Sequence, residues 1–374
     1  MNIGDWATAQ VKARPPIAMP EAPVENAAAW LGRDLQKRTD WQYRLDGKEL
    51  KELEAALAHV KREGLAMVEV GKRDFPLGSL SGTLRELRKE IISGRGFVLL
   101  RGLPVDEVGM EDAAMLYWGI GMHLGYPVMQ NAKGHLLGHV TDLGEISLED
   151  RSGSNRGERF IHTELRGFAS TSGTTYHVDQ CDIVGLFCLR PAKSGGESRI
   201  VSTVSIHNEI MRRRPDLLKA LYEPWWIERR KEIPAGKQPF FPMPQFHYHN
   251  GRIYACWRRG RLDIEKLTNE LPPRSPAQLE ALALGDELMN DPDFHLWMDF
   301  QKGDVQLLNN YVIAHRRSAY EDFPEMEKRR YLLRLWMVTP DAPPLPHWYY
   351  EEFGAGRRGG IYVPGVPEVA NLEP

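Results

Sequence analysis

Cysteine is scarce in this sequence, and it lacks long apolar runs and a strong net charge. Only three cysteines, Cys181, Cys188 and Cys256, occur among 374 residues. They are too few for a disulfide framework, show no zinc-site spacing and fit a reducing compartment. No stretch reaches the roughly 18 apolar residues of a membrane-spanning helix, and the N-terminus has no apolar run of the kind found in signal peptides. We therefore expect a cytoplasmic protein without a membrane partner.

Charge excludes a second class of partner. Lysine and arginine total 48, aspartate and glutamate total 51, and the net charge is −3. A nucleic-acid binder of this size would carry a broad basic surface, so no nucleic acid is expected. Hydrophobic residues at 42% and charged residues at 26% are ordinary for a globular chain. A small-molecule partner fits this composition, and a homo-oligomer is compatible with it.

Periodicity and turn residues place helices before a block of strands. Helices are expected at 47–63, 82–93, 111–124 and 204–213, and another begins at Ser275-Pro276. Strands are expected at 96–102, 183–189, 197–201, 240–248, 252–257, 305–308 and 331–338. This order favours an α+β protein with a β-sandwich or jelly-roll core. No linker divides the chain, so we expect a single domain over 1–374. It comprises an N-terminal helical extension (1–95), a core (96–340) and a C-terminal surface tail (341–374).

A histidine and an aspartate two residues apart form the first candidate for metal binding. His177 and Asp179 end the segment Thr174-Thr-Tyr-His-Val-Asp, which we expect to be a strand. Residues i and i+2 of a strand point to the same face, so both side chains could bind one metal. The spacing is weak by itself, because His162–Glu164 and His207–Glu209 show it too. A solvated polar pair is the simpler interpretation of any one of them.

A later histidine could complete that group. His315 follows an apolar strand and the pair Asn309-Asn310 in Gly303-Asp-Val-Gln-Leu-Leu-Asn-Asn-Tyr-Val-Ile-Ala-His. Two histidines and one carboxylate, two ligands close together and one distant, suit an octahedral iron(II) site with open positions. The alternative is a core histidine satisfied by hydrogen bonds.

Arginines on a buried strand point to an anionic ligand. In Arg329-Arg-Tyr-Leu-Leu-Arg-Leu-Trp-Met-Val, alternation puts Arg330, Arg334 and Trp336 on one face. Arginine is rarely buried without a partner, and its planar fork suits a carboxylate. A bound dicarboxylate or an internal Arg–Asp or Arg–Glu pair would satisfy these residues.

Taken in order, these segments resemble the taurine dioxygenase and clavaminate synthase family of iron(II)- and 2-oxoglutarate-dependent oxygenases. The resemblance covers roughly 96–340 and rests on five motifs. They are Gly96-Phe-Val-Leu-Leu-Arg-Gly102, His177-Val-Asp179, Ser194-Gly-Gly-Glu-Ser198, Asn310 before His315, and Arg330 to Arg334. The fold that this family implies is a double-stranded β-helix, which is a jelly roll, flanked by helices.

The resemblance also implies roles for individual residues. His177, Asp179 and His315 would be the facial triad, which is both catalytic and metal-binding. Arg334 would bind the distal carboxylate of 2-oxoglutarate, with Arg330 and the Ser198 hydroxyl as further contacts. The stretch from Arg316 to Lys328 is longer than in the family, which leaves Arg330 as an alternative main contact, although the strand pattern favours Arg334. Asn310 would orient the strand that carries His315.

The same resemblance implies the reaction. With Fe(II), 2-oxoglutarate and O₂, the protein would oxidise a C–H bond by hydroxylation or desaturation and release succinate and CO₂. Asp179 fills the position that halogenating relatives leave to a halide, so no chlorinated product is expected. Two rival functions remain open: a cupin-like metalloenzyme that does not use 2-oxoglutarate, and a non-catalytic jelly-roll binding protein.

The substrate is the least determined part of the interpretation. We expect a small polar or natural-product-like molecule. The residues expected near it are Tyr176, Gln180, Gln130, Asn131, Trp257 and Arg316. The aromatic segment 240–257 could form a lid or ordinary core, and its His247 and His249 are expected at the surface.

Overall fold

The largest sheet has seven strands. They are β1 (Gln42–Arg44), β2 (Phe97–Arg101), β3 (Tyr126–Pro127), β4 (Leu137–Thr141), β5 (Ile183–Arg190), β13 (Val305–Asn309) and β16 (Tyr331–Val338). The order is β1-β2-β13-β5-β16-β3, and β4 also pairs with β16. β1 runs parallel to β2, and the other pairs are antiparallel. This computed structural model describes residues 9–12, 14–142, 171–229, 233, 237–353 and 357–372, so the predicted pair His162–Glu164 lies outside the described residues.

A second sheet of three antiparallel strands carries one of the candidate ligands. Its order is β12 (His295–Met298), β7 (Ser198–Ser202) and β14 (Ile313–Arg317). Three two-stranded pairs complete the strands of the described chain. They are β8 (Trp225–Glu228) with β9 (Phe240–Met243), β10 (Phe246–His249) with β11 (Arg252–Ala255), and β6 (Ser194–Gly195) with β15 (Tyr320–Glu321).

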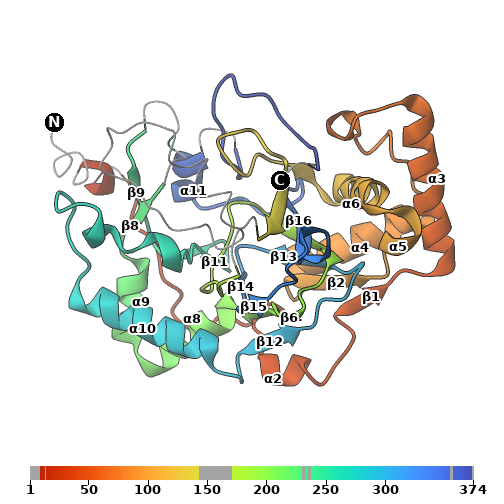
Figure 1. Cartoon of the computed structure of the whole chain (residues 1–374). Helices are drawn as coiled ribbons and strands as arrows, with labels where there is room; N and C mark the ends of the chain where they lie inside the picture. The colour runs from red at the N-terminus through yellow and green to blue at the C-terminus, as the bar shows by residue number, and fades with distance from the viewer. Residues whose placement is uncertain are drawn as a thin grey trace.

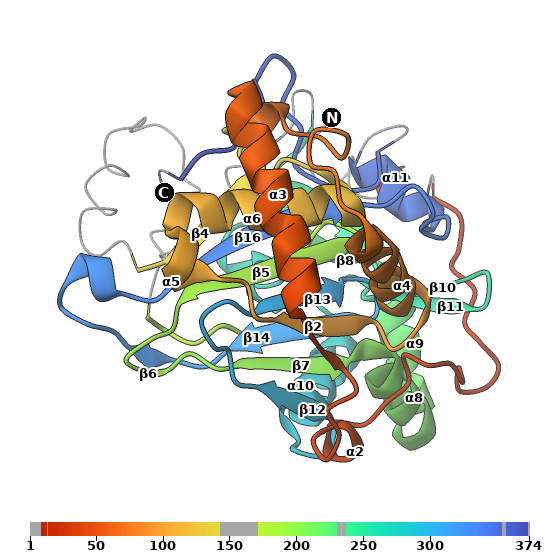
Figure 2. The same ribbon diagram turned by 90° about the vertical axis from the view of Figure 1, so that its right-hand side faces the viewer.

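Helices lie on both sides of the strands (Figures 1 and 2). On one side are α3 (Gly47–Glu63), α4 (Ser79–Ser93), α5 (Val105–Val108) and α6 (Met110–Leu124); on the other are α8 (Thr203–Arg213), α9 (Pro215–Tyr222) and α10 (Pro276–Asn290). The short helices α2 (Gly32–Leu35) and α11 (His347–Phe353) lie near the chain ends. Among the described residues, none of the helices combines the length and apolar character that a membrane span requires.

Alternation along β16 separates two cores. Leu333, Leu335 and Met337 pack with residues of α3, α4 and α6. Trp336, on the opposite face, packs with Ile200 and other residues of the second sheet. The large sheet therefore has helices against one face and the three-stranded sheet against the other, and the face that carries Arg330 and Arg334 looks between the sheets. This mixed α/β arrangement confirms the coarse fold prediction.

Local sequence signals account for the elements that were predicted closely. α3 spans the expected 47–63, because Asp46 and Glu49 form a capping box and Gly64 ends the helix with φ of 66°. α8 ends before Pro215, which then occupies the first turn of α9.

Three expectations about the chain between these elements are wrong. The predicted strand 174–179 forms only isolated bridges at His177. The tail after 341 is not confined to the surface, because α11 inserts Trp348 and Tyr349 into the core. His247, expected at the surface, is fully buried at 0% exposure. Each outcome depends on contacts between distant segments, which local patterns do not encode.

Candidate metal centre

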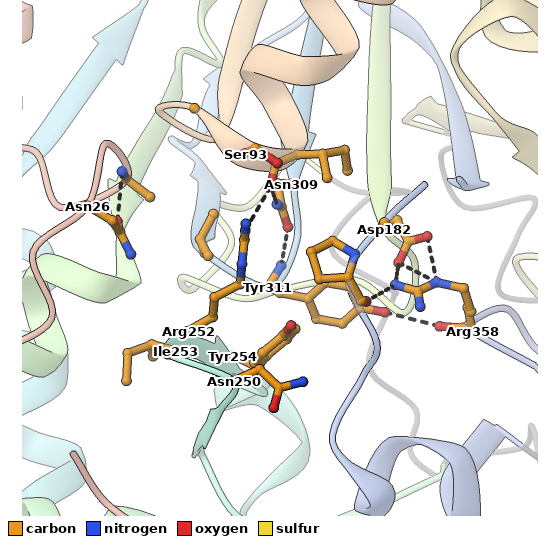
Figure 3. Close-up of a pocket in the computed structure, with 17 residues that line it drawn as sticks. Asn26, Ser93, Asp182, Asn250, Arg252, Ile253, Tyr254, Asn309, Tyr311 and Arg358 are labelled. Atoms are coloured by element: carbon orange, nitrogen blue, oxygen red, sulfur yellow. Dashed lines mark hydrogen bonds and ion pairs between the residues drawn. The ribbon is translucent and has the colours of Figure 1, made fainter. Parts of the chain in front are cut away.

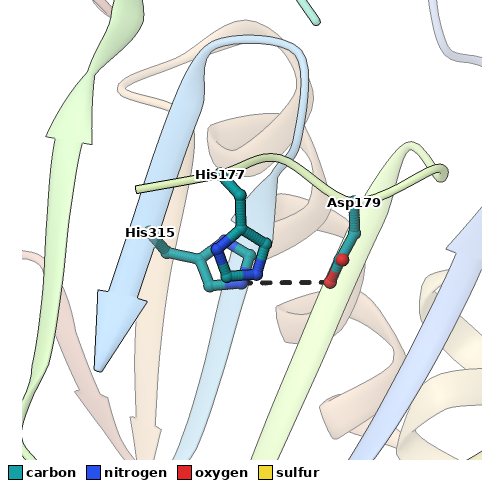
Figure 4. Close-up of side chains that lie close together, drawn as sticks. All are labelled: His177, Asp179 and His315. Carbon is teal, nitrogen blue, oxygen red and sulfur yellow. Dashed lines mark ion pairs between the residues drawn. The ribbon is translucent and has the colours of Figure 1, made fainter. Parts of the chain in front are cut away.

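His177, Asp179 and His315 come together in the structure (Figure 4). Each offers one ligand atom, and these atoms all lie within 4.8 Å of one another. The backbone holds the histidines in place, because His177 and His315 exchange two N–H···O bonds of 3.0 Å. Opposed residues on neighbouring strands direct their side chains to one face, and the two imidazole centroids are 4.4 Å apart.

Each ligand side chain is oriented by a neighbour. His177 Nδ1 lies 2.9 Å from the Thr175 carbonyl oxygen, which leaves Nε2 for a metal. Trp336 Nε1 donates a 3.0 Å hydrogen bond to Asp179 Oδ2. The amide oxygen of Asn310 accepts from the Asp179 backbone N–H at 3.0 Å. Such outer contacts fix ligand geometry in metal sites.

Charge states in the group suit a divalent cation. Burial and then His177 lower the pKa of His315 to about 3, so its imidazole is neutral. Burial raises the pKa of Asp179, but Arg334, His315 and other neighbours outweigh it and hold that pKa below its ordinary value. Two imidazoles and one carboxylate form the donor set of non-haem iron(II) sites, so the residues fit that metal.

Arg334 lies beside the candidate metal ligand Asp179. Its Nη1 is 3.7 Å from Asp179 Oδ2, and its Nε donates a 2.7 Å hydrogen bond to Gln130 Oε1. Gln130 is fixed in turn, because its Nε2 donates to the carbonyl oxygens of Leu136 and Arg334. The structure thus brings the predicted substrate residue Gln130 close to the metal ligands.

Arg330 lies in a different environment. It is 4% exposed, its Nη1 has no hydrogen-bond partner, and no carboxylate within the described ranges forms an ion pair with it. Tyr320 places its ring 5.3 Å from the guanidinium carbon. Gly196, with φ of +77°, permits this placement, because a Cβ there would lie 3.1 Å from Arg330 Nε.

Ser198 and Arg317 extend the environment of Arg330. Ser198 pairs with Arg317 across β7 and β14, and its hydroxyl bonds to Gln306 in the large sheet. Burial and then Arg330 lower the pKa of Arg317 to about 10, so two buried guanidinium groups repel each other here. Arg317 follows His315 by two residues on the same strand face, a separation of about 7 Å.

Five predicted substrate residues do not join the metal group. Tyr176 packs in a core cluster with Trp257, and the Arg316 guanidinium lies over the Tyr176 ring and bonds to Asn290 of α10. Trp257 is fully buried against Gly285. Asn131 accepts from Lys133 N–H in a turn, and Gln180 is buried, with its carbonyl accepting from Gly360 N–H.

The segment 240–257 and the pair His207–Glu209 have structural roles. The aromatic segment is core rather than lid, since Phe240, Phe241 and Phe246 are buried. His207 bonds to Tyr222, while Glu209 pairs with Arg212, so that pair faces apart as expected for a helix.

A cavity of about 250 Å³ lies apart from the metal group (Figure 3). Its lining includes Asp182, Arg252, Tyr254, Tyr311 and Arg358, but no member of the triad. Arg358 forms a 3.0 Å ion pair with Asp182, and Tyr311 donates to the Arg358 carbonyl. Arg252 donates to the Ile92 carbonyl at the end of α4. These polar groups therefore serve contacts between segments.

Residues 60–336 match the family model described as "Taurine catabolism dioxygenase TauD, TfdA family". The chain belongs to this family. The expected resemblance is thereby confirmed, and the match begins within the segment 1–95 that was expected to be an extension. β1 of that segment is a strand of the large sheet, and α4 packs against this sheet.

Individual relatives agree with this membership. FR-33289 synthase of Streptomyces rubellomurinus is 28% identical over 328 residues, which cover 87% of this chain and 93% of the relative. A structure of asparagine oxygenase with Fe(II), 2S,3S-3-hydroxyasparagine and succinate matches with a TM-score of 0.61 at 16% identity, over 80% of this chain and 94% of that one. The oxygenase OrfP with Fe and alpha-ketoglutaric acid matches with a TM-score of 0.57 at 17% identity, with the same coverage. The two structures show a shared fold.

Two residues near this centre, Arg317 and Trp336, were not selected as site residues from the sequence. Arg317 could have been found, because strand alternation puts it on the face of His315. Trp336 was placed on the face of Arg334, but its bond to Asp179 joins segments far apart in the chain.

Proposed function

We propose that the protein is an Fe(II)- and 2-oxoglutarate-dependent dioxygenase with a double-stranded β-helix core, acting on a small, polar, anionic molecule. The observation that carries the proposal is the joint presence between the same two sheets of the triad and of the buried Arg330, whose guanidinium has no ion-pair partner among the described residues. The triad fits iron, and the buried cation of Arg330 requires an organic anion. When bound, iron with 2-oxoglutarate and O₂ supplies the oxidation of a C–H bond, leaving succinate and CO₂.

Arg330 and Ser198 are the side chains that we assign to the distal carboxylate of 2-oxoglutarate. Four carbon–carbon bonds of about 1.5 Å give an extended five-carbon chain of roughly 5 Å. That length is similar to the separation of about 7 Å between His315 and Arg317, which are two residues apart on β14. Arg317 pairs with Ser198 on β7. A carboxylate here would also neutralise the repulsion between Arg330 and Arg317.

We assign Arg334 to the substrate. It lies beside Asp179 rather than beside Ser198, which differs from the main role expected for it from the sequence. Gln130 accepts from its Nε and holds this cation next to the metal ligands. An anionic or polar group of the substrate fits the cation.

Succinate formation tests the proposed function. Purified protein with Fe(II), 2-oxoglutarate, O₂ and a panel of small acids should release succinate, while His177→Ala, Asp179→Ala and His315→Ala should not. His347→Ala is a matched control, because His347 lies on α11 with a 61% exposed side chain. Substrate oxidation without 2-oxoglutarate would favour the cupin-like rival, and a chlorinated product would contradict the role of Asp179.

A further inference from the structure

Arg258 lies next to a metal ligand, although the two residues are distant in sequence. His177 forms a bridge to His315 on one side and an antiparallel bridge to Arg258 on the other. The neighbouring Val178 N–H donates to the Trp257 carbonyl at 2.8 Å, which fixes this register. Opposed residues of adjacent strands direct their side chains to one face. Arg258 therefore projects from the face that carries the two imidazoles.

The Arg258 guanidinium is buried, with 4% exposure of the residue. Among the residues that the structure describes, neither its Nε nor its Nη1 has a hydrogen-bond partner. Within the described residues, no carboxylate comes within ion-pair distance of it. The Phe241 ring lies 5.9 Å from its central carbon. A buried cation with unsatisfied donors is unfavourable unless a ligand completes it.

The buried acid in this region is already occupied. Arg258 is one of the charges that influence the pKa of Glu352. However, Glu352 receives both ends of the Arg229 fork, with 2.8 Å between Nη2 and Oε2 and a second, shorter contact through Nη1. Within the described residues, the ion pair of the Glu352 carboxylate is with Arg229 and none joins it to Arg258. Arg258 thus keeps its fork available to a further oxyanion.

We propose that Arg258 binds an oxyanion group of the substrate, a carboxylate, phosphate or phosphonate, on the His177 side of the metal. This inference rests on the proposed function for the identity of the molecule as substrate. Arg334 of β16 lies on the Asp179 side, whereas Arg258 follows β11 and bridges to His177, so the two arginines approach the metal group from different segments. The site therefore selects an acid whose charged group is anchored by Arg258 while its reacting carbon faces the metal.

Anion binding to the holoprotein tests this subsite. The protein is loaded anaerobically with Fe(II) and saturating 2-oxoglutarate, so that the Arg330 pocket is filled. Acetate, inorganic phosphate and methylphosphonate are then titrated separately at constant ionic strength, with calorimetry and the melting temperature as readouts. The three arms distinguish a carboxylate from a phosphate or phosphonate site. Saturable binding of at least one probe is expected.

Variants locate that binding. Arg258→Met should weaken it at least tenfold, because the oxyanion loses a charge-assisted fork. Arg258→Lys keeps the charge without the fork, so it should bind several-fold more weakly than the wild type. Arg259→Gln is the matched control and should bind like the wild type, since Arg259 is engaged by Asp286 and Asp263.

The outcomes separate this inference from the proposed function. Absence of saturable binding in the wild type, or a loss of less than tenfold in Arg258→Met, overturns the subsite. If circular dichroism shows Arg258→Met to be unfolded, wild-type affinity in Arg258→Lys overturns it instead. Succinate formation by the wild-type protein is measured in parallel. Its failure alongside Arg258-dependent anion binding would refute the dioxygenase function and leave an anion site.

Discussion

Two arginines four residues apart on one strand face experience opposite surroundings. Arg334 contacts Asp179 and Gln130, whereas burial lowers the pKa of Arg330, whose guanidinium lacks a carboxylate partner in the described chain. The sequence identified both and their shared face, and it favoured Arg334 for the distal carboxylate. It could not show their different surroundings, because these arise from the segments across the interior.

Replacing these arginines separately should reveal their roles. Arg330→Met should raise the 2-oxoglutarate concentration for half-saturation more than tenfold, because a charge-assisted fork contributes on the order of 1.5–3 kcal/mol. Arg334→Met should affect the substrate requirement more. Titration of the visible band of the anaerobic Fe(II)–2-oxoglutarate complex measures the first effect. Arg329→Met is the matched control, since Arg329 bonds to the Phe323 carbonyl oxygen instead. A larger effect of Arg334→Met on this titration would restore the assignment expected from the sequence.

Trp336 offers a second test at the residue scale. Trp336→Phe keeps the ring packing but removes the hydrogen bond to Asp179 Oδ2. Loss of an outer-shell partner costs about 10–100-fold in metal affinity or activity, so Fe(II) affinity should fall by at least about tenfold. Competition with a metal chelator measures it. Trp297→Phe, on β12 with a 40% exposed side chain, should leave affinity unchanged; an equal loss in both variants would refute an effect through Asp179.

Neighbours of a ligand residue in sequence are not its neighbours in space. Strand alternation sends Tyr176 and Arg316 to the face opposite His177 and His315, where they contact each other. The same rule was available from the sequence and places both on the face opposite the metal ligands. Arg258, by contrast, meets His177 only through a register between distant segments, which no local pattern reveals.

At the scale of elements, local signals predicted helices better than they predicted the segments that position the site. The boundaries of α3 follow from its caps, and β5 and β16 from their apolar runs. The segment around His177 lacks a ladder of its own and is held by bridges to His315 and Arg258. Its conformation is therefore a product of the assembled fold.

Gly285 offers a test of the packing between α10 and the core. A Cβ on Gly285 would lie 2.3 Å from Trp257. Gly285→Ala should therefore destabilise the protein by about 1–3 kcal/mol from overpacking, although alanine is the better helix former by about 1 kcal/mol. Gly47→Ala is the control, because nothing lies within 4 Å of its added Cβ. Urea unfolding compares them, and unchanged or increased stability of Gly285→Ala would contradict this packing.

At the scale of the whole molecule, buried neutral histidines make stability depend on pH. Burial lowers the pKa of His247 to about 3 and those of His207 and His139 to about 4. Unfolded histidine titrates near 6.5. Between these values the unfolded chain binds more protons, so stability is present above about pH 6.5 and is lost as the pH falls.

His247 should carry a measurable part of that loss, because it is fully buried and neither ring nitrogen has a hydrogen-bond partner in the described chain. Each such histidine contributes up to about 1.4 kcal/mol per pH unit to the slope of unfolding free energy between the two pKa values. His247→Phe keeps an aromatic ring beside Tyr349 and removes the titrating group. Urea unfolding between pH 5 and 7 should therefore give a slope that is shallower by about that amount. His347→Ala, on the exposed side of α11, should keep the wild-type slope. A wild-type slope in His247→Phe would mean that the imidazole is protonated alike in the folded and unfolded chains, so its burial would not be the source of acid sensitivity.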